Sequence, residues 1–203
     1  MGEIGLFPLG VVLLPTERLP LHIFEERYKE LIGECIEGDL DFGLVFAEGD
    51  ELVEVGTRAR VAQVLTRFPD GRLNVLVEGG GRFLVDELTD GRSFQTARVS
   101  PLDDEDDPAS PESIDRALGQ FERLREMTAS EVESPAASEP QLSFAIAGRV
   151  ELAAEAKLGL LRDLSERSRM ETLGELLDAV IAGAERVRIA SERASTNGRV
   201  ELG

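Results

Sequence analysis

The chain is poor in the residues that most often bind metals or form disulfides. Its 203 residues include one cysteine, Cys35, and one histidine, His22. A single cysteine cannot form an internal disulfide, and these two side chains are too few for the usual ligands of a structural zinc site. We therefore expect a cytoplasmic chain with no metal and no other cofactor.

Positive charge is also scarce. Lysine and arginine together number 22 against 40 aspartates and glutamates, which gives a formal net charge of −18. Such a charge repels the phosphates of nucleic acids and the headgroups of anionic lipids, and it favours cationic partners. Neither a nucleic acid nor a membrane is an expected partner.

Long apolar runs are absent as well. The apolar opening at 4–15 contains Pro8 and Pro15 and follows Glu3, where a signal peptide carries positive charge. It is too short to span a bilayer, so we expect neither an export signal nor a membrane helix. An apolar share of 42% is typical of a globular protein with one domain or two small ones.

Alternating apolar residues predict a small β-barrel over residues 1–102. Leu73, Val75 and Val77 share one face of a strand at 72–78, and a matching run at 59–68 precedes Pro69-Asp70-Gly71, a sequence typical of a three-residue hairpin loop. At their spacing, further strand-like runs favour a barrel over a parallel sheet; they lie at 19–24, 41–47, 82–87 and 93–99. One helix interrupts the strands, with an apolar face formed by Tyr28, Leu31, Ile32, Cys35 and Ile36.

Two segments lack apolar periodicity. Residues 103–112 hold six acids and two prolines, and 130–140 is rich in serine, alanine, glutamate and proline. Both are expected to be solvated linkers, since they bury too little apolar surface to offset the entropy of ordering. A calcium loop at 103–112 is disfavoured because the turn glycine is missing and Ile114 occupies the twelfth position.

After the acidic linker the apolar period becomes that of a helix. Ser110 can cap a helix that has Pro111 in its first position, and apolar stripes continue to a long helix at 171–194. Residues 113–194 are therefore predicted to form a helical bundle, with a flexible tail at 195–203. The expected fold class is α+β, a barrel followed by a helical subdomain.

The sequence carries no catalytic motif that we recognise. Lys29 and Lys157 lie outside any phosphate-binding glycine loop, and Gly79-Gly80-Gly81 is typical of a bend or bulge. No Gly-x-Ser-x-Gly elbow accompanies His22, which we expect to be structural or solvent-facing. Cys35 is expected in the core, where desolvation disfavours its thiolate. We expect no enzyme activity.

The opening of the chain resembles the Lon protease N-terminal domain family. The matching strings are Leu6-Phe7-Pro8-Leu9, Leu14-Pro15 and Leu19-Pro20-Leu21-His22-Ile23-Phe24-Glu25-Glu26-Arg27-Tyr28, then Gly56-Thr57-Arg58-Ala59, Asp70-Gly71-Arg72, Glu78-Gly79 and Arg82-Phe83. The resemblance implies a PUA-like barrel with one helix, followed by a helical subdomain. Full Lon proteases continue with an AAA+ motor and a Ser-Lys protease domain. This chain resembles the stand-alone members without them, for which the family implies recognition of substrates or partners.

Most of the matching residues have structural explanations. The prolines fix backbone direction, the aromatic residues can fill a seam between barrel and helix, and the charged residues can form ion pairs at its rim. The residues read in this way are Phe7, Pro8, Pro15, Pro20, Ile23, Phe24, Glu25, Arg27, Tyr28, Gly56, Gly79, Arg82 and Phe83. Apolar side chains without such an explanation are the candidate peptide-binding residues: Leu9, Val11, Leu13, Leu14 and Phe68.

The resulting hypothesis is a non-catalytic module that binds apolar or unfolded protein segments in a cleft between barrel and bundle. The acidic charge favours ligands with lysine or arginine flanks, and a separate ATPase or protease is a possible partner. Two alternatives stay open: an RNA-binding PUA-like protein, supported only by Arg58, Arg60, Arg67 and Arg72, and a hydrolase that uses His22. The oligomeric state is left open too.

Overall fold

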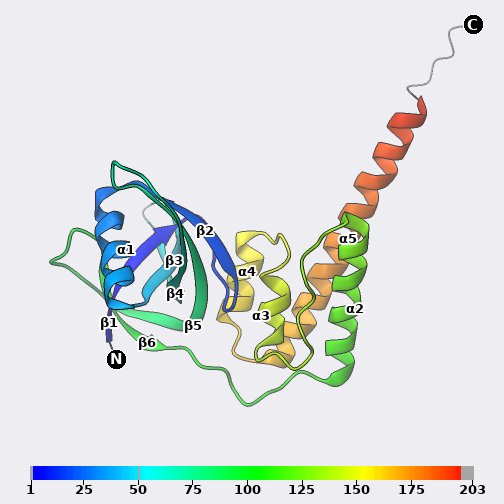
Figure 1. The fold of residues 1–203 in the computed structure, drawn as a ribbon. Coiled ribbons are helices and arrows are strands. Elements are labelled where there is room, and N and C mark those ends of the chain that lie inside the picture. Colours follow the sequence, from blue (N-terminus) through cyan, green and yellow to red (C-terminus); the bar gives the residue numbers. More distant parts are fainter. Residues whose placement is uncertain (1, 50, 198–203) are drawn as a thin grey trace, which may run out of the picture.

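The computed structural model describes residues 2–49 and 51–197. Figure 1 shows a β-barrel with one helix against it, beside a helical half from which the last helix extends. The strands are β1 (Gly2–Leu9), β2 (Arg18–Ile23), β3 (Phe42–Glu48), β4 (Glu51–Arg67), β5 (Leu73–Thr89) and β6 (Thr96–Pro101). The helices are α1 (Glu26–Gly38), α2 (Pro111–Thr128), α3 (Leu142–Ala147), α4 (Ala154–Arg162) and α5 (Glu166–Asn197). The expected α+β class is confirmed.

The barrel wall in the described part of the chain is one six-stranded sheet. Its order is β2-β5-β4-β3-β1-β6, and a further pairing between β5 and β6 closes it. The predicted hairpin joins β4 to β5: the N–H of Phe68 donates to the carbonyl of Arg72 over 2.9 Å, and Gly71 has a φ of +83°. β5 pairs first with β2 and then with β6. β2 is therefore an end strand of the sheet.

The glycine triplet lies inside β5. The sequence suggested separate strands at 72–78 and 82–87, but both belong to this one strand. A Cβ on Gly79 would collide with the carbonyl oxygen of Leu14. Glycine is required there because the loop between β1 and β2, residues 10–17, crosses β5 at this point; the N–H of Thr16 donates to the carbonyl of Gly79 over 2.8 Å.

The helix α1 covers one end of the barrel with the predicted apolar face. Tyr28, Leu31, Ile32 and Cys35 are buried. The Tyr28 ring stacks on Phe7 of β1, with 4.1 Å between the centroids. Helix and barrel thus share one apolar cluster, which stabilises the start of the chain against α1.

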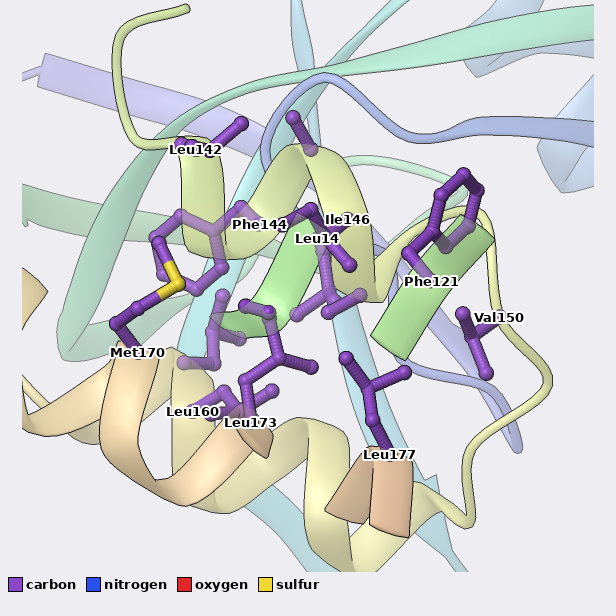
Figure 2. Packing of buried hydrophobic residues seen from close by; sticks show 14 of the residues in the cluster. Leu14, Phe121, Leu142, Phe144, Ile146, Val150, Leu160, Met170, Leu173 and Leu177 are labelled. Carbon is purple, nitrogen blue, oxygen red and sulfur yellow. The ribbon is translucent and has the colours of Figure 1, made fainter. Parts of the chain in front are cut away.

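The helical half packs around α3. Its residues Phe144 and Ile146 lie among side chains of α2, α4 and α5, as Figure 2 shows. The predicted cap of α2 is confirmed, since the backbone N–H of Ser113 donates to the Ser110 hydroxyl over 3.1 Å. α5 begins earlier than the expected position 171 and continues through residue 197. The rest of the predicted tail, 198–203, lies outside the described residues.

Two consecutive leucines in the loop between β1 and β2 enter different cores. Leu13, 1% exposed, joins the cluster of the barrel and α1, whereas Leu14, 0% exposed, joins the cluster of the helices (Figure 2). The expectation that both lack a structural role is wrong. Folding brings each of them against residues that are distant in the sequence.

The acidic segment at 103–112 is tied to both halves of the molecule. Both carboxylate oxygens of Asp104 accept bonds of 2.6 Å from the Arg169 guanidinium of α5, and Asp104 also pairs with Arg82 of β5. Arg82 and Arg169 are buried. The expectation of a solvated linker is therefore wrong at Asp104, and Arg82 lies at the junction with the helices rather than at the rim beside α1. We call Arg82, Asp104 and Arg169 the junction network.

Candidate functional site

The outward face of β2 carries side chains with little protein around them. Leu21 and Ile23 point into the barrel and are buried, whereas Pro20 and His22 are exposed. Phe24, the next residue with the outward parity, is 59% exposed. Its predicted place in the seam between barrel and helix is wrong, because period-two alternation directs it away from the neighbours of Ile23.

Phe24 belongs to a row of rings. The His22 ring lies 5.9 Å from the Phe24 ring at an interplanar angle of 23°, and 6.1 Å from the Phe68 ring in an edge-on arrangement. Nδ1 of His22 is 2.6 Å from Oδ1 of Asn74 on β5, and the Arg72 guanidinium lies 5.1 Å from the Phe68 ring centroid. These contacts hold the three rings on the barrel wall, where a ligand could stack on them.

A groove of about 280 Å³ opens beside the row. One wall is the end of β1, with Pro8 and Leu9, and the other is β2 from Pro20 onward, continued by Phe24. Its floor includes the stacked rings of Phe7 and Tyr28. We call this hollow, together with the rings of His22, Phe24 and Phe68, the β2 groove.

Two of the five candidate peptide-binding residues lie at this groove. Leu9 lines the groove. Phe68 lies next to it, because its ring contacts the ring of His22, which lines the groove. Val11 is 40% exposed in the loop between β1 and β2, and it is not among the lining residues. Leu13 and Leu14 are closed off from a ligand by burial. The sequence analysis allowed a solvent-facing His22, but it missed Phe24 as a surface residue, although the alternation of β2 placed Phe24 on the same outward face as His22.

The charged residues near the groove are paired with one another. Arg27 bonds to Glu25 over 2.8 Å, and Lys29 bonds to Glu26 over 2.7 Å. Arg72 at the hairpin pairs with an aspartate two residues before it. The predicted ion pair of Glu25 with Arg27 is thus present, and both partners line the groove beside its apolar side chains.

The cleft expected between barrel and helices is also present, with a volume of about 810 Å³. Its walls carry Glu17, Arg149 and Lys157; the amine of Lys157 donates to Glu17 over 2.5 Å. Glu78 lies there as well. Burial would raise its pKa, but hydrogen bonds from Arg60 and Arg18 outweigh this effect and lower the pKa. More charged side chains line this cleft than line the β2 groove.

The surroundings of Cys35 and His22 do not favour catalysis by either residue. Burial raises the pKa of the Cys35 thiol to about 11, and the charges of Glu34 and Asp41 act in the same direction. The thiolate is therefore disfavoured, as the sequence predicted. His22 is exposed, and in residues 2–49 and 51–197 its ring bonds to the side-chain amide of Asn74 and not to a hydroxyl or thiol.

Three of the four arginines that supported RNA binding lie close to carboxylates. Arg60 pairs with Glu78, and Arg72 pairs with Asp70. Arg58 lines a different pocket, together with four acids: Glu3, Glu34, Asp39 and Asp41. A phosphate backbone would meet carboxylates beside each of these cations.

The described range of the chain has neither a metal-binding cluster nor a membrane-spanning helix. No group of three or more histidine, cysteine, aspartate or glutamate side chains is arranged there to hold a metal ion. No helix of that range combines the length and the apolar content needed to cross a bilayer.

Comparison with known proteins identifies the fold. The profile of the ATP-dependent protease La (LON) substrate-binding domain matches residues 3–179. The chain belongs to this family. Within the LON substrate-binding domain family, a Lon N-terminal domain protein from Xanthomonas campestris has a similar structure, with a TM-score of 0.66 and 25% sequence identity over 85% of this chain and 97% of that one. The N-terminal domain of a Mycobacterium avium complex Lon protease matches with a TM-score of 0.64 and 16% identity, over 87% of this chain and 98% of that one.

The matching relatives are much longer than this chain. A Lon protease from Brucella suis biovar 1 is 27% identical over 198 residues, covering 89% of this chain and 24% of that protein. A Lon protease from Azorhizobium caulinodans is 27% identical over 188 residues, covering 85% of this chain and 22% of that protein. The family resemblance drawn from the sequence is confirmed, and what is shared is the substrate-binding domain.

Proposed function

We propose that this protein is a polypeptide-recognition module that binds apolar segments of unfolded or partly unfolded proteins at the β2 groove. The observation that carries the proposal is the exposed Phe24 ring, near His22 and Phe68, beside a hollow that is lined mostly by apolar side chains. Exposed aromatic rings next to a concave apolar surface are typical anchors for protein ligands. Membership of the LON substrate-binding domain family supports the same function.

The charge of the chain favours a particular kind of ligand. With a net charge of −18, the field around the protein attracts apolar segments flanked by lysine or arginine and repels acidic ones. Because the charges next to the groove are paired with one another, the attraction of basic segments comes from the net charge of the whole chain, and salt weakens it. We expect it to appear mainly in the association rate.

The proposed role involves no bond cleavage. A high thiol pKa at Cys35 and an exposed His22 paired with an amide support a binding role over a hydrolase. Release of captured segments to a separate ATPase or protease is part of the proposal, since the named relatives are Lon proteases. The cytoplasmic location expected from the sequence stays a prediction.

A peptide titration tests the proposal. Two fluorescent peptides with the same apolar centre, one with lysine flanks and one with glutamate flanks, are titrated at low salt against the wild type, Phe24→Ala and Leu88→Ala. Leu88 is a matched control because it is 50% exposed on β5 and does not line the groove. We expect the basic peptide to bind the wild type and Leu88→Ala, and to lose about tenfold or more in affinity with Phe24→Ala. Equal binding to all three proteins would refute the groove as the site.

A further inference from the structure

The edge of β2 that faces the groove has no strand partner in the described part of the chain. β2 pairs with β5 on one side, through the register from Arg18 opposite Glu78 to Ile23 opposite Leu73, and it is the end strand of the sheet. At such an edge, alternate residues direct their N–H and C=O groups outward. Pro20 lies in this strand, which fits an edge because proline has no N–H to give to a neighbour.

Across the groove, the end of β1 is also half-paired. β1 bonds to β6 through residues Gly2–Gly5, and to β3 through Leu6–Leu9. Within residues 2–49 and 51–197, its second side therefore has no strand partner at Pro8 and Leu9, which line the groove. The hollow of about 280 Å³ lies between these two strand edges. A ligand there meets backbone hydrogen-bonding groups together with apolar side chains.

We propose that the β2 groove binds its ligand as an added β-strand, paired with the outer edge of β2. The inference rests on the proposed function and names its substrate class. The ligand is an extended, proline-free segment of another protein, with apolar side chains at alternate positions and basic residues at its ends. Alternate side chains would enter the groove beside Phe24 and Leu9, while the outward backbone groups of β2 donate and accept hydrogen bonds, except at Pro20, which can only accept.

The chemistry of the site favours this occupant over a second copy of the chain. Two copies would each bring a formal charge of −18, so association through the same edge works against their mutual repulsion. A folded partner with no free strand edge cannot supply the outward row of N–H and C=O groups. An unfolded segment supplies both the backbone groups and the side chains, and backbone pairing makes recognition tolerant of sequence.

The test compares three peptides of identical sequence, each about nine residues long, the length of a typical strand. They have lysines at both ends and phenylalanine or valine alternating with threonine between them. One is unmodified, and the other two carry N-methyl groups on alternate amides, so that each blocks one edge of the peptide strand. We expect the unmodified peptide to bind, one methylated peptide to lose about 30-fold in affinity, and the other to lose less than about threefold.

Amide hydrogen exchange on the full chain locates the contact. Strand addition slows exchange at residues 18–24 when the unmodified peptide is bound, and leaves 148–152 in the interdomain cleft unchanged. Equal affinities of the three peptides would overturn strand addition while leaving the proposed function intact. Slowed exchange that is confined to 148–152 would also overturn it. So would a protein that fails to bind the peptide and whose molecular mass in solution doubles as its concentration rises. If the unmodified peptide does not bind at concentrations up to about 1 mM, the proposed function itself fails.

Discussion

Replacing Asp104 tests whether the junction network stabilises the molecule. In Asp104→Asn, the guanidinium groups of Arg82 and Arg169, 1% and 0% exposed, lose the carboxylate that lies between them. Removing one partner of a buried ion pair costs about 3–5 kcal/mol. Glu166 still bonds to Arg169 over 2.5 Å, so we expect a loss near the lower limit, about 3 kcal/mol.

The magnitude can be read from thermal unfolding. For a chain of this size, a loss of about 3 kcal/mol corresponds to a fall in Tm of about 6–12 °C. Asp106→Asn is the matched control: it removes an equal charge from an exposed side chain in the same segment, and it should change the stability by less than about 0.5 kcal/mol. If both variants melt within about 2 °C of each other, the junction network does not stabilise the fold as reasoned here.

The pH dependence gives the same prediction a second readout. Burial would raise the pKa of Asp104, but the hydrogen bonds and charge of Arg169 outweigh it, and the folded-state pKa is lowered. The stabilisation is therefore fully present above the unfolded pKa of about 3.9 and is lost as the pH falls through the lower folded value. Between pH 5 and pH 3 the wild type should lose more stability than Asp104→Asn, as measured by urea unfolding at each pH.

Three further predictions concern buried positions. Leu14→Ala should cost about 2–5 kcal/mol in the free energy of unfolding because the side chain is fully buried, whereas Val11→Ala should change it by less than about 0.5 kcal/mol; similar values for both would contradict the assigned packing. With a thiol pKa of about 11, Cys35 should react with iodoacetamide at pH 8 about 100-fold more slowly in the folded protein than in urea, and rapid labelling of the folded chain would refute its burial. Gly79→Ala should destabilise the protein by about 1–3 kcal/mol because its Cβ meets the Leu14 carbonyl, while Gly80→Ala, which has room for a Cβ, should be close to neutral in the same urea titration.

Local patterns predicted the regular elements well because they depend on neighbours in the sequence. The hairpin at Pro69-Asp70-Gly71, the cap at Ser110 and the apolar face of α1 were all visible in this way. Phe24 was assigned to the core from its size, although the alternation of β2 already placed it outward with His22. In that case the alternation of β2 was the better guide to burial than the size of the side chain.

The remaining differences come from contacts between distant residues. Asp104 lies in a run of acids that resembles a solvated linker, and its role depends on Arg169, which is 65 residues away. Leu13 and Leu14 are neighbouring leucines in the same apolar run, and the sequence does not distinguish them, yet each enters a different core. The β2 groove likewise joins the end of β1 to β2 and the hairpin, so only the folded chain brings Leu9 and Phe68 to one surface.

The loop that carries Leu13 and Leu14 has a consequence for any attempt to study the halves separately. Val12 and Leu14 belong to the barrel half of the sequence, but they are buried in the cluster that is formed mainly by the helices. Figure 2 shows Leu14 among the side chains of that cluster. A fragment that stops at residue 102 would hold these side chains out in water, and we expect it to self-associate or to aggregate. Truncated or chimeric versions of the protein should therefore keep the helices together with the strands.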